Sequence, residues 1–149
     1  SGMHEEIVAV TPEVEDDENE AIEVVTPATY YLKNGKHYIV YEEVVEGTSG
    51  VIKNRIKING EECVEIVKSG LSNSHMIFEK NKKNQTFYKT PYGQMLIGVN
   101  TRHLQVDFEE DKIAVQIDYE LDVNHEPMAD CKIRMNIVSK DSGKFSVLS

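Results

Sequence analysis

Lys68, Tyr88, Arg102 and Tyr119 are the side chains whose type and position could form a binding site. Lys68 and Arg102 each lie an even number of positions from aliphatic residues in a predicted strand. Each is therefore expected to point to the same face of the sheet as those residues. The phenols of Tyr88 and Tyr119 are placed to line the same space. A few inward polar groups orient a small ligand in an otherwise apolar cavity. The sequence therefore predicts these four as candidate ligand-binding residues.

The same residues also fit a purely structural role. Lys68 and Arg102 could lie near a barrel mouth, with the aliphatic stem buried and the charge in water. Tyrosines at such positions, Tyr30 and Tyr38 included, usually pack in a core. Both interpretations stay open from the sequence.

Motifs for catalysis or for binding metals and cofactors are absent from the sequence. It contains no GxSxG, P-loop, HExxH or glycine-rich dinucleotide loop. Adjacent carboxylates such as Glu42-Glu43, Glu61-Glu62 and Glu109-Glu110 would point to opposite faces of a strand, which makes them poor acid–base pairs. His125 and Cys131 could join a metal site, but a loop histidine and a core cysteine is the simpler interpretation. We expect a non-catalytic protein with no cofactor and no metal. A hydrolase or isomerase with an unrecognised site is an alternative.

The net charge of −10 is concentrated near the N-terminus. Residues 1–23 hold nine acids and no Lys or Arg, and the remainder holds 17 acids against 16 bases. The segment is either an acidic arm, or a cation site at residues 15–18, or a solvated turn between two edge strands. Four consecutive carboxylates lack the spacing of a calcium loop. Since the body has no basic surplus, no nucleic-acid partner is expected.

Length and composition predict a single domain. The 149 residues are 40% hydrophobic and 28% charged, which is ordinary for a globular protein. No apolar stretch approaches the length of a membrane span and no signal peptide is evident, so we expect no membrane partner. Cys63 and Cys131 suggest reduced, buried thiols and a cytoplasmic location.

The predicted domain spans residues 3–140 and has an acidic first hairpin at residues 5–23. Residues 1–2 look like a scar of tag cleavage, and residues 141–149 are expected to be a loose tail.

The segment from Ile113 to Val123 does most to predict the fold. Every second residue in it is apolar, which indicates a strand with one dry and one wet face and favours an antiparallel sheet. Similar patterns recur about every ten residues, with turn signals between them. The predicted strands are 5–11, 20–32, 36–45, 50–58, 62–69, 75–80, 85–90, 94–108, 112–123 and 129–139. The sequence thus predicts an all-β barrel or sandwich in meander order.

At three places the sequence predicts a departure from regular strand pairing. At Asn59-Gly60 a bulged turn would pair Ile56 with Val64 and keep residues 53, 55 and 57 on the outer face. The phase of apolar residues changes within the strand 94–108, which predicts a bulge or bend at residues 100–103. The sequence Thr90-Pro91-Tyr92-Gly93 predicts an edge break or a kinked corner.

Five segments occur in an order that is typical of a known family: Tyr30–Lys33, Tyr38–Glu43, Lys68–Gly70, Met76–Phe78 and, most specifically, Tyr88–Gly93. Together they resemble the YwiB-like family of small bacterial proteins. The resemblance covers most of the chain. It implies an antiparallel, calycin-type (lipocalin-like) barrel of eight to ten strands, and no established activity or catalytic residues.

Two kinds of function follow as expectations. The first is binding of a small, partly apolar ligand inside the barrel, anchored by Lys68 and a tyrosine. The second is a protein–protein interaction module that uses the outer surface, the acidic N-terminal segment or the edge strands, and a homodimer is one form of it. The chain departs from well-known lipid carriers, for example because it contains no Trp. A role in lipid transport would therefore rest on analogy of fold alone.

Overall fold

Every regular element of the protein is a β-strand in the part that the structure, a computed structural model, describes: residues 4–15, 21–23, 25–71 and 73–139. The strands are β1 (His4–Glu15), β2 (Ala21–Glu23), β3 (Thr26–Lys33), β4 (Lys36–Val44), β5 (Val51–Asn59), β6 (Cys63–Gly70), β7 (Ser74–Glu79), β8 (Lys83–Thr90), β9 (Gly93–Phe108), β10 (Lys112–Val123) and β11 (Glu126–Ser139). The predicted strand at 20–32 is divided into β2 and β3, and the first predicted strand extends to Glu15.

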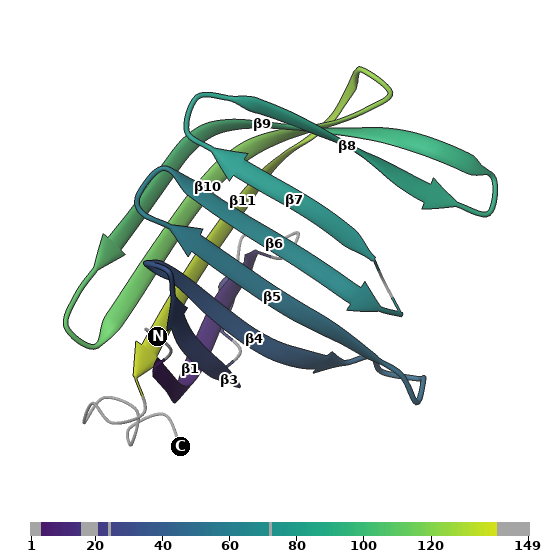
Figure 1. Cartoon of the computed structure of the whole chain (residues 1–149). Helices are drawn as coiled ribbons and strands as arrows, with labels where there is room; N and C mark the ends of the chain where they lie inside the picture. The colour runs from purple at the N-terminus through teal and green to yellow at the C-terminus, as the bar shows by residue number, and fades with distance from the viewer. Residues whose placement is uncertain (1–3, 16–20, 24, 72, 140–149) are drawn as a thin grey trace.

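The strands form one antiparallel sheet that curls into a barrel (Figure 1). Their order is β7-β6-β5-β4-β3-β1-β11-β10-β9-β8, with the short β2 beside β1. This is the predicted all-β meander, and ten strands lie along the path. The first and last long strands, β1 and β11, pair with each other.

The barrel is not closed by a backbone ladder between β7 and β8. These strands follow one another in the chain, yet they are the two ends of the sheet path, and Figure 1 shows them diverging. One isolated hydrogen bond spans the region: the Thr86 hydroxyl of β8 donates to the carbonyl of His75 in β7 at 3.4 Å.

Aliphatic side chains fill the middle of the barrel. The buried residues on the inner face are Ala28, Ile39, Ile56, Ile58, Val64, Phe78, Val99, Leu104, Val106, Ile113, Val115, Ile117, Met135 and Ile137. β10 contributes every second residue from Ile113 to Ile117 to this core, as its alternation predicts. Burial of this apolar surface is the main stabilising contribution to such a fold.

The predicted irregularity in residues 100–103 is present as a β-bulge. Asp118 pairs with His103 and Tyr119 pairs with Thr101, so Arg102 has no register partner in β10. The extra residue moves the apolar phase from Val99 to Leu104 and keeps both of them buried. Because of the bulge, β9 contributes buried side chains to the core on both sides of residues 100–103.

Two local predictions about turns were wrong in detail. The β5–β6 turn spans three residues beginning at Gly60, so Ile56 pairs with Ile66 instead of Val64. The faces are nevertheless the predicted ones, because the error is two residues and preserves the phase. Pro91 and Tyr92 form a tight hairpin turn between β8 and β9 rather than a kinked corner.

Three predicted segments lie wholly or partly outside the described residues. They are the scar at residues 1–2, the acidic residues 15–18, of which only residue 15 is described, and the tail at 141–149. Within the described part of the chain there is no helix with the length and apolar character needed to cross a bilayer.

Candidate ligand site at one end of the barrel

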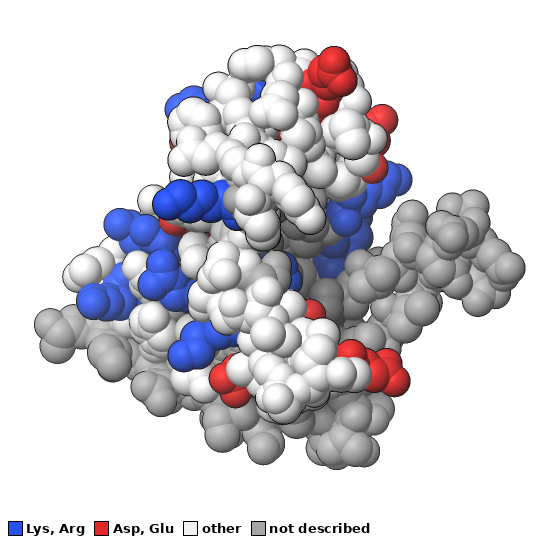
Figure 2. Space-filling model, turned by 90° about the vertical axis from the view of Figure 1, so that its right-hand side faces the viewer, with Lys and Arg blue, Asp and Glu red and all other residues white. Residues whose placement is uncertain are grey.

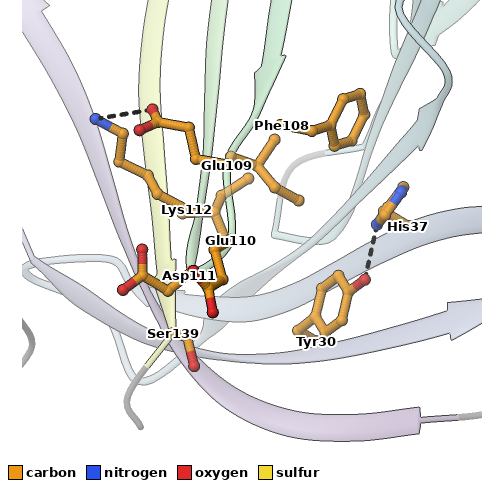
Figure 3. Close-up of a pocket in the computed structure, with 10 residues that line it drawn as sticks. Tyr30, His37, Phe108, Glu109, Glu110, Asp111, Lys112 and Ser139 are labelled. Carbon is orange, nitrogen blue, oxygen red and sulfur yellow. Dashed lines mark hydrogen bonds and ion pairs between the residues drawn. The ribbon is translucent and has the colours of Figure 1, made fainter. Parts of the chain in front are cut away.

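A pocket of about 370 Å³ lies at the end of the barrel where the β3–β4 and β9–β10 turns meet (Figure 3). We call it the mouth pocket. It is lined by Tyr30, His37, Phe108, Glu109, Glu110, Asp111, Lys112, Ile113, Ile137 and Ser139. Strand direction alternates in a meander, so these two turns must lie at the same end of the sheet.

One side of the mouth pocket is aromatic. The Tyr30 hydroxyl is 2.7 Å from His37 Nδ1, and the rings of His37 and Phe108 lie 4.9 Å apart between centroids. Figure 3 shows these three side chains together on one side, with the charged residues of the β9–β10 turn across from them. Buried Ile113 and Ile137 complete the lining. The pocket thus offers apolar contact together with hydrogen-bonding groups.

The charged side of the mouth pocket is mainly acidic. Lys112 Nζ lies 3.5 Å from a carboxylate oxygen of Glu109, which neutralises one of the charges. Glu110 and Asp111 add two further carboxylates to the lining. A ligand with a hydrogen-bond donor or a positive charge suits this side better than an anion does.

His37 is expected to lower the stability of the fold on acidification. Burial lowers the pKa of His37 below its ordinary value of 6.5. A depressed pKa in the folded state means that its stabilising contribution is complete above pH 6.5 and is lost as the pH falls through the folded pKa. NMR titration of His37 should give a pKa below 6.5, and urea unfolding of His37→Gln should depend less on pH below 6.5 than that of the wild type. Equal pH dependence of the two proteins would contradict this assignment.

The predicted site residue Lys68 lies elsewhere, in a polar cluster on the inner face of β4–β6. Lys68 Nζ donates to Glu43 Oε1 at 2.9 Å and to Asn54 Oδ1 at 2.8 Å. Asn54 Nδ2 donates to the same Glu43 oxygen at 2.6 Å, and Asn54 is completely buried. Buried Asn54 and the partly exposed charges of Lys68 and Glu43 therefore all have partners within the protein, as expected where a polar side chain is buried.

Contacts within this cluster shift the pKa values of Glu43 and of the neighbouring Tyr41. Burial alone would raise the pKa of Glu43, but hydrogen bonds from Lys68 and Asn54 and the charge of Lys68 outweigh it, so the pKa is lowered. Burial, with a smaller effect from Glu43, raises the pKa of Tyr41 to about 12. Glu43 is thus ionised and Tyr41 neutral near pH 7.

Replacement of Lys68 by methionine tests the structural role of this cluster. Lys68→Met leaves Asn54 Oδ1 buried without its partner, which should cost about 1–3 kcal/mol in the free energy of unfolding. Urea denaturation measures the loss. The matched control is Lys89→Met on β8, an exposed lysine, which should change the stability by less than about 0.5 kcal/mol. Equal effects of the two variants would show that Lys68 does not serve the cluster.

Tyr119 and Arg102 line a second pocket, of about 420 Å³, together with Cys131. Tyr119 packs edge-on against Phe78 with centroids 4.9 Å apart, and burial and the neighbouring Cys131 raise its pKa. Arg102 lies in the bulge, exposed, and pairs with Glu120 at 2.9 Å. Arg102 therefore does not point into the barrel.

Tyr88 and Tyr38 complete the set of predicted residues. Tyr88 is half-buried on β8 and pairs in register with Met95. Tyr38 stacks on Tyr31 at 4.8 Å, and its register partner Lys57 places it on the outer face. The four predicted site residues thus do not form one site, although Arg102 and Tyr119 share a pocket.

Metal and thiol chemistry finds little support in the geometry. Residues 4–15, 21–23, 25–71 and 73–139 contain no group of three or more His, Cys, Asp or Glu side chains that could hold a metal ion. Cys63 and Cys131 are both free and half-buried. Burial, together with Glu79 and Glu65, raises the pKa of Cys63, which disfavours the reactive thiolate.

The residues of the mouth pocket were largely missed by pattern reasoning. Neither His37 nor Phe108 was among the predicted site residues. A usable signal was present, because turns at Asn34-Gly35 and Glu110-Asp111 fall at the same end of a meander. Combining strand direction with turn position would have brought Tyr30, His37 and Phe108 together.

Comparison with known proteins places this fold in a family. A family described as "Domain of unknown function (DUF1934)" matches residues 7–135. The chain belongs to the DUF1934 family. A relative in Bacillus subtilis (strain 168), described as "Uncharacterized beta-barrel protein YwiB", is 32% identical over 114 residues, which are 76% of this chain and 78% of the relative. The resemblance to the YwiB-like family is therefore confirmed.

The fold of this DUF1934 member also matches a solved structure. The crystal structure of the ywiB protein from Bacillus subtilis superposes with a TM-score of 0.71, covering 93% of this chain and 95% of that one at 24% identity. At this identity the match shows the fold alone. The family and its relative carry no described activity, so they confirm a β-barrel protein of unknown function.

Proposed function

We propose that this DUF1934 member is a non-catalytic protein that binds a small, partly apolar ligand in the mouth pocket. The observation that carries the proposal is the composition of the pocket: aromatic and aliphatic walls with a few converging polar groups in a volume of about 370 Å³. Binding sites for small molecules commonly have this composition and a volume of about 300–1,000 Å³. Half-buried free thiols at Cys63 and Cys131 support a reducing, cytoplasmic location.

The mouth pocket is a better candidate than the middle of the barrel. The middle is filled by side chains such as Ile56, Ile117 and Met135. The polar cluster around Lys68 satisfies its own hydrogen bonds, so it has less need of a ligand group. At the mouth, Glu110 and the Tyr30–His37 pair border open space.

Native mass spectrometry of protein purified from its host without denaturation tests the proposal. We expect a species heavier than the chain by the mass of a small organic molecule. The double variant His37→Ala and Phe108→Ala should lose this species, and the control Phe87→Ala, which alters an aromatic residue exposed on β8, should keep it. Retention of the adduct by the pocket variant would contradict the assignment of the site, and bare protein in every native preparation would contradict ligand binding.

Protein–protein interaction is a second candidate function, favoured by the β8–β9 hairpin. Phe87 is 72% exposed and Tyr92 at the turn is 99% exposed. The edge of β8 that faces β7 carries no backbone ladder. Exposed aromatic residues beside a free strand edge are typical of surfaces that contact another chain.

A further inference from the structure

The β8–β9 hairpin projects beyond the strand that precedes it in the chain. The Thr86 hydroxyl contacts the carbonyl of His75 near the start of β7, so the residues of β8 that follow Thr86 extend past that start. Figure 1 shows the hairpin leaving the barrel on this side, and Figure 2 views the molecule from the side to which it projects. Uncharged side chains dominate the near surface in Figure 2, with Lys and Arg side chains gathered on its left. The outer edge of β8 is thus accessible to another chain.

The backbone groups of Phe87 point to this free edge. Phe87 is the register partner of Leu96 in β9. The Leu96 amide donates to Asn124 Oδ1 at 3.0 Å, and the Leu96 carbonyl accepts from the Asn124 amide at 2.8 Å, so both groups are used on the side away from β8. The N–H and C=O of Phe87 therefore have no partner in β9, and those of Lys89 follow by the alternation of an antiparallel ladder.

A second hydrogen bond gives the same alternation. The Thr101 amide of β9 donates to the carbonyl of Lys82, just before β8, at 3.0 Å. Lys82 is thus bonded to β9, and Phe87 lies an odd number of positions beyond it. Since alternate residues of a strand bond to opposite sides, Phe87 and Lys89 present their amides and carbonyls to the side that lacks a neighbour. Such an edge is a template for a further strand.

The side chains along this edge are an exposed ring and an exposed positive charge. Phe87 is 72% exposed, and Lys89 is exposed two positions further on the same face of the sheet. Lys89 is the only charged residue from Asn84 to Thr101, and its register partner is Gln94. Among the residues that the structure describes, Lys89 has no ion-pair partner. An uncompensated charge beside an apolar ring favours a partner with a carboxylate beside an apolar side chain.

We propose that an extended acidic segment of a partner protein adds to the free edge of β8 as a further strand. Its backbone would bond to the amides and carbonyls of Phe87 and Lys89. Its apolar side chain would cover Phe87, and a carboxylate two positions away on the same face would meet Lys89. The proposal rests on the candidate role in protein–protein interaction and is independent of ligand binding in the mouth pocket.

Other occupants fit this edge less well. Pairing of β8 with β8 of a second copy would bring no carboxylate to Lys89, because residues 84–101 contain none. A single-stranded nucleic acid could meet the ring and the charge, but it has no row of amides and carbonyls to match the backbone of β8. A peptide strand satisfies both the backbone and the charge.

Selection from a phage-displayed library of random peptides of about nine residues tests the partner chemistry on the full chain. We expect enrichment of sequences with Asp or Glu two positions from an apolar residue. In fluorescence polarisation, Lys89→Glu should weaken binding of the enriched peptide at least ~10-fold, and a peptide with Lys in place of its acidic residue should restore binding to that variant. The matched control Lys132→Glu changes an exposed lysine of β11 and should bind as the wild type does.

Hydrogen exchange measured by NMR tests the strand addition itself. A saturating amount of the enriched peptide should slow exchange of the Phe87 and Lys89 amides at least ~10-fold, whereas the Tyr88 amide, which faces β9, should change little. N-methylation of the peptide at alternate residues should abolish binding in one phase and spare it in the other, because an added strand bonds through one edge.

Three results would overturn the proposal. A peptide that binds without protecting the Phe87 and Lys89 amides would contradict strand addition, while the candidate role in protein interaction would stand. No enriched sequence at all would contradict both. Binding of a single-stranded oligonucleotide that Lys89→Glu abolishes, with no enriched peptide, would show that the hairpin serves a nucleic acid instead.

Discussion

Ile117→Ala is expected to lower the free energy of unfolding by about 3–4 kcal/mol, since it opens a cavity in the middle of the barrel. Ile117 is completely buried on β10, between Leu104 of β9 and Ile133 of β11 in the register. The sheet surrounds the site, so neighbouring strands cannot easily move into the space. Urea denaturation monitored by circular dichroism gives the loss.

The matched control for this prediction is Ile117→Val. It removes a single methylene group at the same position and should cost only about 1 kcal/mol. A loss below about 1 kcal/mol for Ile117→Ala would mean that the middle of the barrel is loosely packed. In that case the interior of the barrel would again be a candidate ligand site.

Gly98→Ala is expected to destabilise the fold by about 2–3 kcal/mol, because no room exists for a β-carbon at this position. A Cβ on Gly98 would overlap Asp122 Oδ1 and would lie 2.6 Å from the Cγ of the same residue. Asp122 is only 4% exposed, and its other oxygen pairs with Lys83 Nζ at 2.7 Å. To make room, the aspartate would have to leave that pair and its buried position.

A double-mutant cycle separates this clash from a general intolerance of β-carbons in β9. In the Asp122→Ala background the obstructing carboxylate is absent, so Gly98→Ala should cost less than about 1 kcal/mol. The coupling between the two sites should thus exceed about 1 kcal/mol. Equal costs of Gly98→Ala in both backgrounds would show that the aspartate is not the obstacle.

The sequence predicted the elements of this fold well because the physical signal is local. Alternation of apolar residues from Ile113 to Val123 identifies β10, and the change of phase before Leu104 identifies the bulge in β9. The register of β5 against β6 was not predictable in the same way. The turn can begin one residue earlier at Asn59 or, as observed, at Gly60, and either register places a base of β5, Arg55 or Lys57, opposite Glu65.

The candidate site was less predictable, because it depends on the ends of strands that are distant in the chain. Lys68 was predicted correctly to face inward, but its partners Glu43 and Asn54 come from two other strands. Arg102 was assigned to the interior by its phase with Leu104, whereas the bulge removes that phase relation. The mouth pocket requires Tyr30, His37 and Phe108 to meet, which only the order of strands determines.

Methyl NMR during titration with a library of small organic molecules tests the central claim most directly. With isotope-labelled isoleucine methyl groups, ligands should shift the signals of Ile113 and Ile137, which line the mouth pocket, and leave Ile52 at the other end of β5 unchanged. The His37→Ala and Phe108→Ala variant should weaken those shifts. Shifts confined to Ile52, or no saturable shift with any compound, would contradict binding at the mouth of the barrel.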